Sequence, residues 1–173
     1  LNITDFLQQQ QKDPRVVFDV RSPGEFEQGH ILGATSFALF DDAERAVVGT
    51  LYKQQGKEDA VQKGLELVGP KLAPFIAEAK RLCPEGKLFL YCWRGGMRSQ
   101  NMALLFTTAG FEVEVIDGGY KTYRKHIREA LGSPLQLIIL SGRTGSGKTE
   151  ILRALEAQGE QIIDLEGIAH HKG

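Results

Sequence analysis

Short apolar runs with strand character alternate with helical patterns along the first three quarters of the chain. The runs read RVVFDV, ATSF, KLFLY and EVEVID, at residues 15–20, 34–37, 87–91 and 112–117. Because parallel strands need a crossover between them, this alternation predicts a parallel sheet flanked by helices, in an α/β fold. The longest helical stretch, residues 41–83, contains breaks at Gly56, Gly69 and Pro70, so we expect three helices there.

Composition is that of a globular protein. Hydrophobic residues make up 42% of the 173 residues, and no apolar run approaches the roughly 20 residues that cross a bilayer. The first ten residues lack the profile of a secretory signal. The two cysteines, Cys83 and Cys92, have no metal-ligand spacing and are too few for a disulfide framework. We therefore expect a cytoplasmic protein without a metal site.

A second unit begins near residue 133. Gly132 and Pro134 stop a helix, and the apolar run LQLIIL starts at residue 135. A loop, a helical pattern and a second apolar run follow, and about forty residues are too few to bury an α/β core. We predict a first domain over residues 1–132. Residues 133–173 are predicted to be the start of a truncated second domain, a single βαβ unit.

The stretch YCWRGGMRSQ, residues 91–100, places a cysteine between a strand and a helix. Backbone N–H groups and the helix dipole favour an anion at such a point, and a thiolate is an anion. We predict that Cys92 is a nucleophile with a lowered pKa. An ordinary core cysteine is the alternative, and it is the expected role of Cys83. The predicted anion-binding residues of the Cys92 loop are Arg94, Gly95, Gly96, Met97 and Arg98.

Three motifs in order resemble the rhodanese family over about residues 1–130. They are VVFDVRSPGEFEQGHILGA from residue 16, YCWRGGMRS from residue 91 and DGGYKTYR from residue 117. The resemblance implies a rhodanese-like fold and a cysteine that accepts sulfur or selenium as a persulfide or perselenide. It also implies a frame of hydrogen bonds and ion pairs formed by Asp19, Arg21, Glu25 and His30. A role of His30 as catalytic base is the lesser alternative.

The spacing of the Cys92 loop departs from the commonest pattern of that family. Five residues separate Cys92 from Arg98, whereas many single-domain rhodaneses have four. The C-x5-R spacing is that of thiol phosphatases, and the longer loop suits a tetrahedral, phosphate-like group. A sulfurtransferase or a thiol phosphatase with an appended nucleotide-binding module therefore stays open as an alternative. A non-catalytic module that docks tRNA or a protein is a second one.

The stretch GRTGSGKT, residues 142–149, matches the P-loop motif between an apolar run and a helical pattern. Its glycines let the backbone wrap phosphates, Lys148 contacts terminal phosphate oxygens, and Thr149 is the candidate ligand of a nucleotide's Mg²⁺. Asp164, in the run EQIIDL at residues 160–165, is either a carboxylate near the metal or a helix cap. The predicted phosphate-binding residues are Gly142, Gly145, Ser146, Gly147, Lys148 and Thr149.

A rhodanese-like unit joined to a P-loop unit resembles the family of tRNA 2-selenouridine synthases, as do the stretches at residues 41–68 and 162–173. The resemblance implies an enzyme that replaces sulfur by selenium in the wobble 2-thiouridine of tRNA. Selenophosphate would be the donor, and an S-geranylated intermediate would form from geranyl diphosphate. Cys92 would be the nucleophile or selenium carrier, with Arg94 and Arg98 holding the anion. An enzyme that supplies selenophosphate is a further candidate partner.

The segment GGYKTYRKHIR, residues 118–128, is basic on one helical face. Tyr120, Tyr123, Ile127 and Leu131 share the opposite face. The cations are candidate tRNA contacts, and the alternative is an ordinary solvated surface. We call these four residues the basic row: Lys121, Arg124, Lys125 and Arg128.

Overall fold

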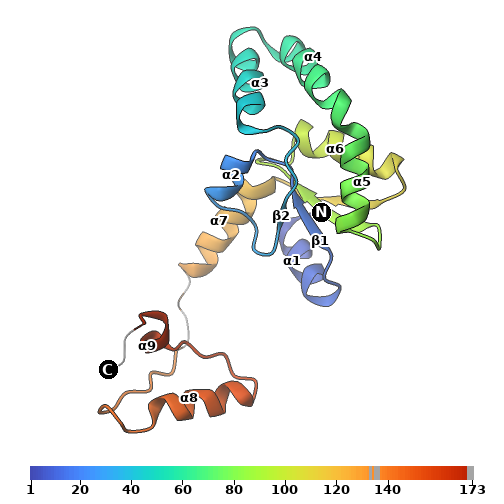
Figure 1. Ribbon diagram of the computed structural model, residues 1–173. Coiled ribbons are helices and arrows are strands. Elements are labelled where there is room, and N and C mark those ends of the chain that lie inside the picture. Colours follow the sequence, from blue (N-terminus) through green and yellow to red (C-terminus); the bar gives the residue numbers. More distant parts are fainter. Residues whose placement is uncertain (133, 135–136, 171–173) are drawn as a thin grey trace. The chain divides into compact units, whose positions relative to one another are not determined.

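The computed structural model describes residues 1–132, 134 and 137–170 (Figure 1). Two compact units are present, Leu1–Ser133 and Pro134–Gly173, and each is described by itself. The domain boundary after residue 132 remains a prediction. The elements of the first unit are α1 (Ile3–Lys12), β1 (Val16–Asp19), α2 (Pro23–Glu27), β2 (Thr35–Ser36), α3 (Asp42–Gln54), α4 (Lys57–Val68), η1 (Gly69–Lys71), α5 (Leu72–Leu82), β3 (Lys87–Tyr91), α6 (Met97–Thr108), β4 (Glu112–Val115) and α7 (Gly119–Leu131).

The four strands form one parallel sheet in the order β2-β1-β3-β4. Val17 of β1 is paired with Phe89 of β3, and Leu88 of β3 is paired with Val113 of β4. Each strand lies within one of the four runs read from the sequence. The predicted parallel sheet flanked by helices is therefore confirmed.

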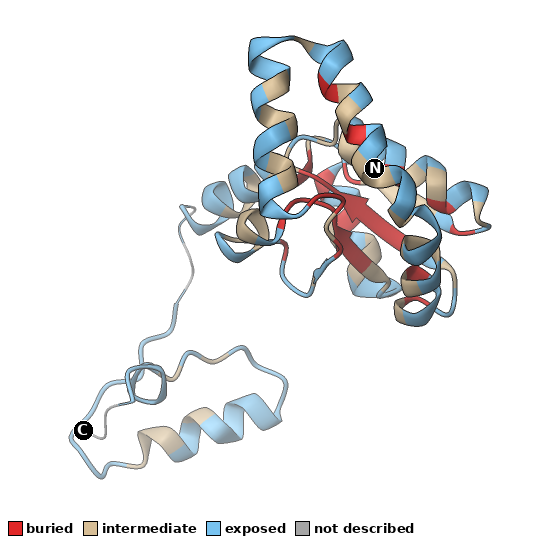
Figure 2. Ribbon diagram, turned by 45° about the horizontal axis from the view of Figure 1, so that its top comes forward, coloured by how far each residue is buried: buried red, intermediate tan, exposed pale blue. Residues whose placement is uncertain are grey.

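The strands lie at the buried centre of the first unit (Figure 2). Side chains of the central strands alternate between two hydrophobic clusters, one on each face of the sheet. Leu88, Leu90 and Cys92 contact the cluster that α5 and α6 cover. Phe89 and Tyr91 contact the cluster that α1 and α7 cover. This alternation follows from the period of two along a strand, and it places Cys92 on the α6 side.

The helical stretch at residues 41–83 contains the three predicted helices, α3, α4 and α5. Helix α3 begins with a capping box, in which the side chains of Asp41 and Glu44 each accept the other's backbone N–H. Gly56, at φ +104°, separates α3 from α4. The short η1 turn at Gly69–Lys71 then leads into α5.

The second unit contains helices α8 (Lys148–Ala157) and α9 (Leu165–Ile168). Strands were predicted at residues 135–140 and 160–165. The described residues of these runs, 137–140 and 160–165, form no strand, so the prediction is wrong for them. Residues 135 and 136 lie outside the described residues. A strand needs a hydrogen-bonded neighbour and a cover for its apolar side chains. Among the residues that the structure describes, no strand pairs with Ile138 or Ile139, and these side chains are 101% and 84% exposed. Among the described helices, none is long and apolar enough to span a membrane.

Candidate functional site

Cys92 follows the last residue of β3 and lies just before α6, with 4% of its surface exposed. The loop between these elements turns at Gly95, whose φ is +66°. A Cβ atom on Gly95 would lie only 3.0 Å from the carbonyl oxygen of Ile116 and 3.1 Å from the nitrogen of Gly118. The loop therefore requires glycine for both its backbone conformation and its packing.

Helix α7 is joined to the Cys92 loop by backbone hydrogen bonds. The N–H of Tyr120 donates to the carbonyl of Cys92 at 2.9 Å, and the N–H of Lys121 donates to the carbonyl of Trp93 at 3.0 Å. Gly119 makes this approach possible, because a Cβ atom there would collide with the carbonyl oxygen of Cys92. Loop and helix thus form one unit around the thiol.

The Cys92 thiol is paired with the hydroxyl of Ser99, a fully buried residue in the first turn of α6. The Sγ atom of Cys92 lies 3.2 Å from Ser99 Oγ, and Ser99 Oγ also donates to the carbonyl of Gly96 at 3.0 Å. The single hydroxyl proton serves one acceptor at a time. When the thiol loses its proton, the hydroxyl turns to the sulfur, because a charged acceptor binds more strongly.

Opposing effects set the pKa of Cys92. Burial alone would raise the pKa of the thiol, but the hydroxyl of Ser99, the backbone N–H groups of Arg94 and Ser99 and the charge of Arg98 stabilise the thiolate. The net shift of the pKa is downward. The geometry therefore favours the thiolate form of Cys92, which is the form that a nucleophile at this position would need. By contrast, Cys83 is 2% exposed in the core and donates from Sγ to the carbonyl of Lys87.

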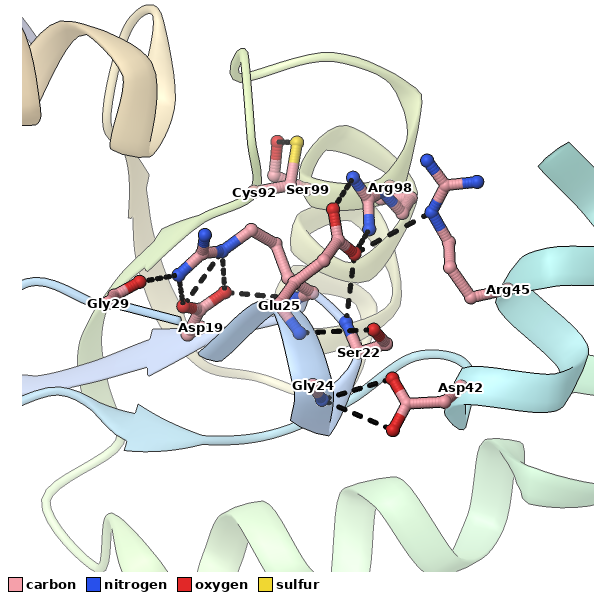
Figure 3. A network of polar contacts seen from close by, with 11 residues as sticks. Asp19, Ser22, Gly24, Glu25, Gly29, Asp42, Arg45, Cys92, Arg98 and Ser99 are labelled. Atoms are coloured by element: carbon pink, nitrogen blue, oxygen red, sulfur yellow. Dashed lines mark hydrogen bonds and ion pairs between the residues drawn. The ribbon is translucent and has the colours of Figure 1, made fainter. Parts of the chain in front are cut away.

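Arg98 is paired with the carboxylate of Glu25 rather than directed at an open anion site (Figure 3). Its guanidinium donates to Glu25 at 2.6 and 3.3 Å, and Arg45 of α3 lies 3.6 Å from the same carboxylate. Burial would raise the pKa of Glu25, but the two arginines and the N–H of Ser22 lower it overall. The carboxylate therefore stays charged and remains paired with Arg98.

The frame expected of Asp19 and Arg21 is buried beneath the site. Arg21 is 1% exposed, donates to Asp19 at 2.5 to 3.0 Å and reaches the carbonyl of Gly29 at 2.8 Å. Its guanidinium also lies 4.2 Å from the ring centroid of Tyr120, which ties the frame to α7. His30 is exposed and stacks on Phe26, with ring centroids 3.8 Å apart. This stacking contact does not bring His30 to the Cys92 thiol.

The basic row is exposed along α7, as the sequence predicted. It lines a groove of about 770 Å³ together with Trp93 and Arg94 of the Cys92 loop. We call this the basic groove. Met97, the first residue of α6, is 42% exposed. Leu131, predicted on the apolar side of α7, is 74% exposed at the end of the helix. The structure thus brings the basic row and the Cys92 loop together.

The P-loop stretch turns into α8 at Gly147, and both Gly145 and Gly147 have φ of +79°. No side chain caps the N-terminus of α8, so its N–H groups remain available to an anion. Lys148 Nζ donates to the carbonyls of Gly142 and Arg143 at 3.1 and 3.0 Å, which places the ammonium across the loop. Thr149, beside it, is half-buried. These residues fit a phosphate or diphosphate group.

Asp164 acts as the N-cap of α9. Its side chain accepts the N–H of Gly167 at 3.0 Å. Of the two roles that the sequence left open for Asp164, the structure therefore shows the helix cap. Within the described part of the chain, no group of three or more histidine, cysteine or acidic side chains forms a metal-binding cluster. A Mg²⁺ ion at Thr149 would therefore depend on the oxygens of its own ligand.

Residues 3–126 match the family model described as a rhodanese-like domain. The chain belongs to the rhodanese-like family. Residues 135–173 match a second model, described as the tRNA 2-selenouridine synthase AAA domain. A solved structure supports the first match: the N-terminal domain of a putative ATP/GTP binding protein from Clostridium difficile 630. It is 38% identical, with a TM-score of 0.67 over 73% of this chain and 97% of that one.

Curated relatives of this rhodanese-like chain carry the name tRNA 2-selenouridine synthase. The protein from Shewanella denitrificans is 42% identical over 92% of this chain and 44% of its own length. The protein from Serratia proteamaculans is 41% identical over 91% of this chain and 42% of its own length. The chain therefore spans less than half of the length of these relatives.

Three residues of the rhodanese-like site were given no role by the sequence: Ser99, Trp93 and Arg45. Glu25 was expected in an ion-pair frame with Asp19 and Arg21, but it pairs with Arg98 and Arg45 instead. Ser99 beside the sulfur and Trp93 in the basic groove lie within the loop stretch but gave no signal of their own. Glu25 had one: the Ser-x-x-Glu pattern from Ser22 predicts a capping box, and the structure contains it. That pattern places Glu25 at the start of α2, but it says nothing of Arg98, 73 residues away, or of Arg45.

Proposed function

We propose that this chain takes part in replacing sulfur by selenium in the 2-thiouridine of tRNA, with Cys92 as the nucleophile. The observation that carries the proposal is that the activated thiol and the basic row lie on one rigid unit. A group that transfers selenium must stand beside a surface that holds a polyanion. The names of the curated relatives support the same reaction.

Selenophosphate, a tetrahedral anion, is the proposed ligand of the Cys92 loop. In this proposal the Cys92 thiolate attacks its phosphorus, so that an S–P bond forms and the P–Se bond breaks. Hydrogen selenide leaves with the bonding electron pair, and water then hydrolyses the S-phosphocysteine to phosphate and the free thiol. No atom changes oxidation state. Transfer of selenium onto the sulfur as a perselenide would instead leave phosphorus as phosphite, which requires an oxidant to return to phosphate.

The released hydrogen selenide acts on an S-geranylated base. Its selenium attacks C2 of the nucleoside, a C–Se bond forms, and the C–S bond breaks as geranyl thiolate leaves. Geranyl diphosphate supplies the geranyl group at the P-loop, where Lys148 and the N-terminus of α8 hold the diphosphate. A nucleotide with Mg²⁺ at Thr149 is the alternative occupant of that loop. The basic row holds the tRNA, and a selenophosphate-producing enzyme is the supplying partner.

The test is the nucleoside content of tRNA from cells whose gene carries Cys92→Ser. We expect 2-selenouridine to disappear, while a matched Cys83→Ser change leaves it in place, since the Cys83 thiol donates to the carbonyl of Lys87, to which a serine hydroxyl also donates. Unchanged 2-selenouridine in the Cys92→Ser strain would show that Cys92 is not the nucleophile. That result would favour a non-catalytic docking module.

A thiol phosphatase is the second candidate function, favoured by the C-x5-R spacing and the lowered pKa of Cys92. It predicts that the purified chain hydrolyses an aryl phosphate and that Cys92→Ser abolishes the turnover. Selenophosphate cleavage without aryl phosphate turnover would remove this candidate. Both reactions pass through S-phosphocysteine, so the released product, selenide or aryl alcohol, distinguishes them.

A further inference from the structure

Trp93 is a large aromatic residue that lies outside both hydrophobic clusters of the first unit. It is the one tryptophan of the chain, follows Cys92 directly and is only partly buried. Its ring contacts Tyr120, with centroids 5.8 Å apart and planes at 51°. An indole ring contributes most to stability when it is fully buried. Its position in the basic groove therefore points to a role in binding.

The basic groove attracts a polyanion. Arg94 and the basic row supply five positive charges, and the acid among the lining residues, Glu129, lies 3.7 Å from Lys125. Charge alone attracts nucleic acid, acidic peptides and anionic membranes alike. An aromatic ring among the cations favours nucleic acid, because an unpaired base presents a flat π face that stacks on it.

The backbone of Trp93 is also fixed against α7. Its carbonyl accepts the N–H of Lys121, the first residue of the basic row, at 3.0 Å. The carbonyl of Cys92, one residue earlier, accepts the N–H of Tyr120 at 2.9 Å. Because these bonds hold the backbone of the loop against α7, a base on the Trp93 ring would be bound by the residue that directly follows Cys92.

We propose that Trp93 is the platform on which an unpaired RNA base stacks beside Cys92, while the basic row binds the phosphates on either side of that base. This rests on the proposed function, and it adds how the nucleoside is presented. RNA loops with splayed bases are recognised in this way, with stacking for the base and cations for the backbone. Trp93 is thus a substrate-binding residue of the thiol site.

The experiment uses the 173-residue chain and an RNA anticodon stem-loop that carries 2-thiouridine at the wobble position. The same stem-loop with an abasic wobble site is the matched probe. Because the chain has one tryptophan, its fluorescence reports on Trp93 directly. We expect the thiouridine RNA to quench this fluorescence on binding and the abasic RNA to bind without that quenching.

Two variants separate the ring from the charges. Trp93→Leu should weaken binding of the thiouridine RNA by roughly 5- to 150-fold, the range measured for base–aromatic stacking, and should change binding of the abasic RNA little. Arg124→Ala should weaken both RNAs equally and reduce the dependence of affinity on salt. The alkylation rate of Cys92 shows whether each variant keeps the fold of the loop. The fluorescence comparison of the two RNAs uses the wild-type chain, so it tests the proposal even if a variant fails to fold.

Quenching that is equal for the two RNAs, or no quenching at saturation, would overturn the platform and leave the proposed function standing. Binding of polyglutamate as tightly as RNA would show that charge alone acts, and it would also overturn the platform. The proposed function is tested separately: it fails if tRNA from Cys92→Ser cells still contains 2-selenouridine.

Discussion

Arg98 of the Cys92 loop and Glu25 of α2 form a two-point ion pair, with donor–acceptor distances of 2.6 and 3.3 Å. Both side chains are largely covered, at 18% and 25% exposure. A phosphate-like anion at the loop must therefore compete with a carboxylate for the same guanidinium. Arg45 lies 3.6 Å from Glu25 and offers that carboxylate a second cation when Arg98 turns to a ligand. The pair thus limits how tightly the loop binds anions.

Replacing Glu25 with glutamine should tighten anion binding at the loop. The substitution would keep the capping box of α2, because an amide oxygen still accepts the N–H of Ser22. Arg98 is then released from a charged partner, and hydrogen bonds to charged groups contribute about 1.5 to 3 kcal/mol, so we expect a gain of about tenfold or more. The measurement is the protection of Cys92 by inorganic phosphate against iodoacetamide.

Glu44→Gln is the matched control, because Glu44 holds the same capping-box position in α3 and pairs with Lys71. It should leave protection by phosphate unchanged. Arg98→Ala should abolish most of the protection. Equal protection in wild type and Glu25→Gln would mean that Arg98 does not contact the anion.

Removing the hydroxyl of Ser99 should make Cys92 less reactive at neutral pH. The hydroxyl lowers the pKa of the thiol by stabilising its charged form, so Ser99→Ala raises the pKa. A hydrogen bond to a charged acceptor contributes about 1.5 to 3 kcal/mol, so the thiolate fraction and the labelling rate at neutral pH should fall. The check is the pH profile of iodoacetamide labelling, read by peptide mapping.

In that profile the midpoint for Cys92 should move to higher pH in Ser99→Ala, and wild-type Cys92 should react faster than Cys83 at neutral pH. Ser36→Ala, in the exposed strand β2, is the control substitution and should leave the midpoint in place. Labelling of Cys83 before Cys92 would contradict the activated thiolate.

Adding a methyl group at Gly119 should separate the Cys92 loop from α7. The residue has φ +55°, and its Cβ would collide with the carbonyl oxygen of Cys92. Gly86→Ala is the control, since Gly86 has φ +71° but open space around its Cβ position. Backbone strain costs both variants about 1 to 2 kcal/mol. Because the collision adds to this only at Gly119, Gly119→Ala should lower the free energy of unfolding by more than Gly86→Ala does. Denaturant unfolding measures both, and equal losses would show that the close approach is not required.

Substitutions in the P-loop and in the Cys92 loop should change the tRNA nucleosides of cells in different ways. Lys148→Ala removes the charge that we propose holds the diphosphate, so both S-geranylated and 2-selenouridine nucleosides should be absent from tRNA. Cys92→Ser leaves that loop intact, so the S-geranylated nucleoside should accumulate while 2-selenouridine is lost. Mass spectrometry of tRNA digests distinguishes the patterns. Normal geranylation in Lys148→Ala cells would assign the P-loop to a nucleotide instead.

The fold of the first unit was predictable because its signals are local. Apolar runs of four to six residues marked every strand, and glycines marked the breaks between α3, α4 and α5. The position of Cys92 between β3 and α6 followed from the same signals. The exposure of the basic row followed from its helical spacing.

What the sequence did not reveal depends on contacts between distant segments. Arg98 and Glu25 are 73 residues apart, and their pairing appears only when the sheet brings α2 to the start of α6. The strand character of residues 137–140 was a local signal too, but a strand forms only where a neighbouring strand accepts its hydrogen bonds. Local preference is necessary for a strand and not sufficient.

The alternation of side chains along β3 has a consequence for insertions and deletions. Leu88, Leu90 and Cys92 belong to one side of the sheet, and Phe89 and Tyr91 belong to the other. One residue added between Lys87 and Cys92 would turn the sulfur away from Ser99 and towards α1, whereas two added residues would restore its side. Natural length variation in this strand should therefore occur in even steps.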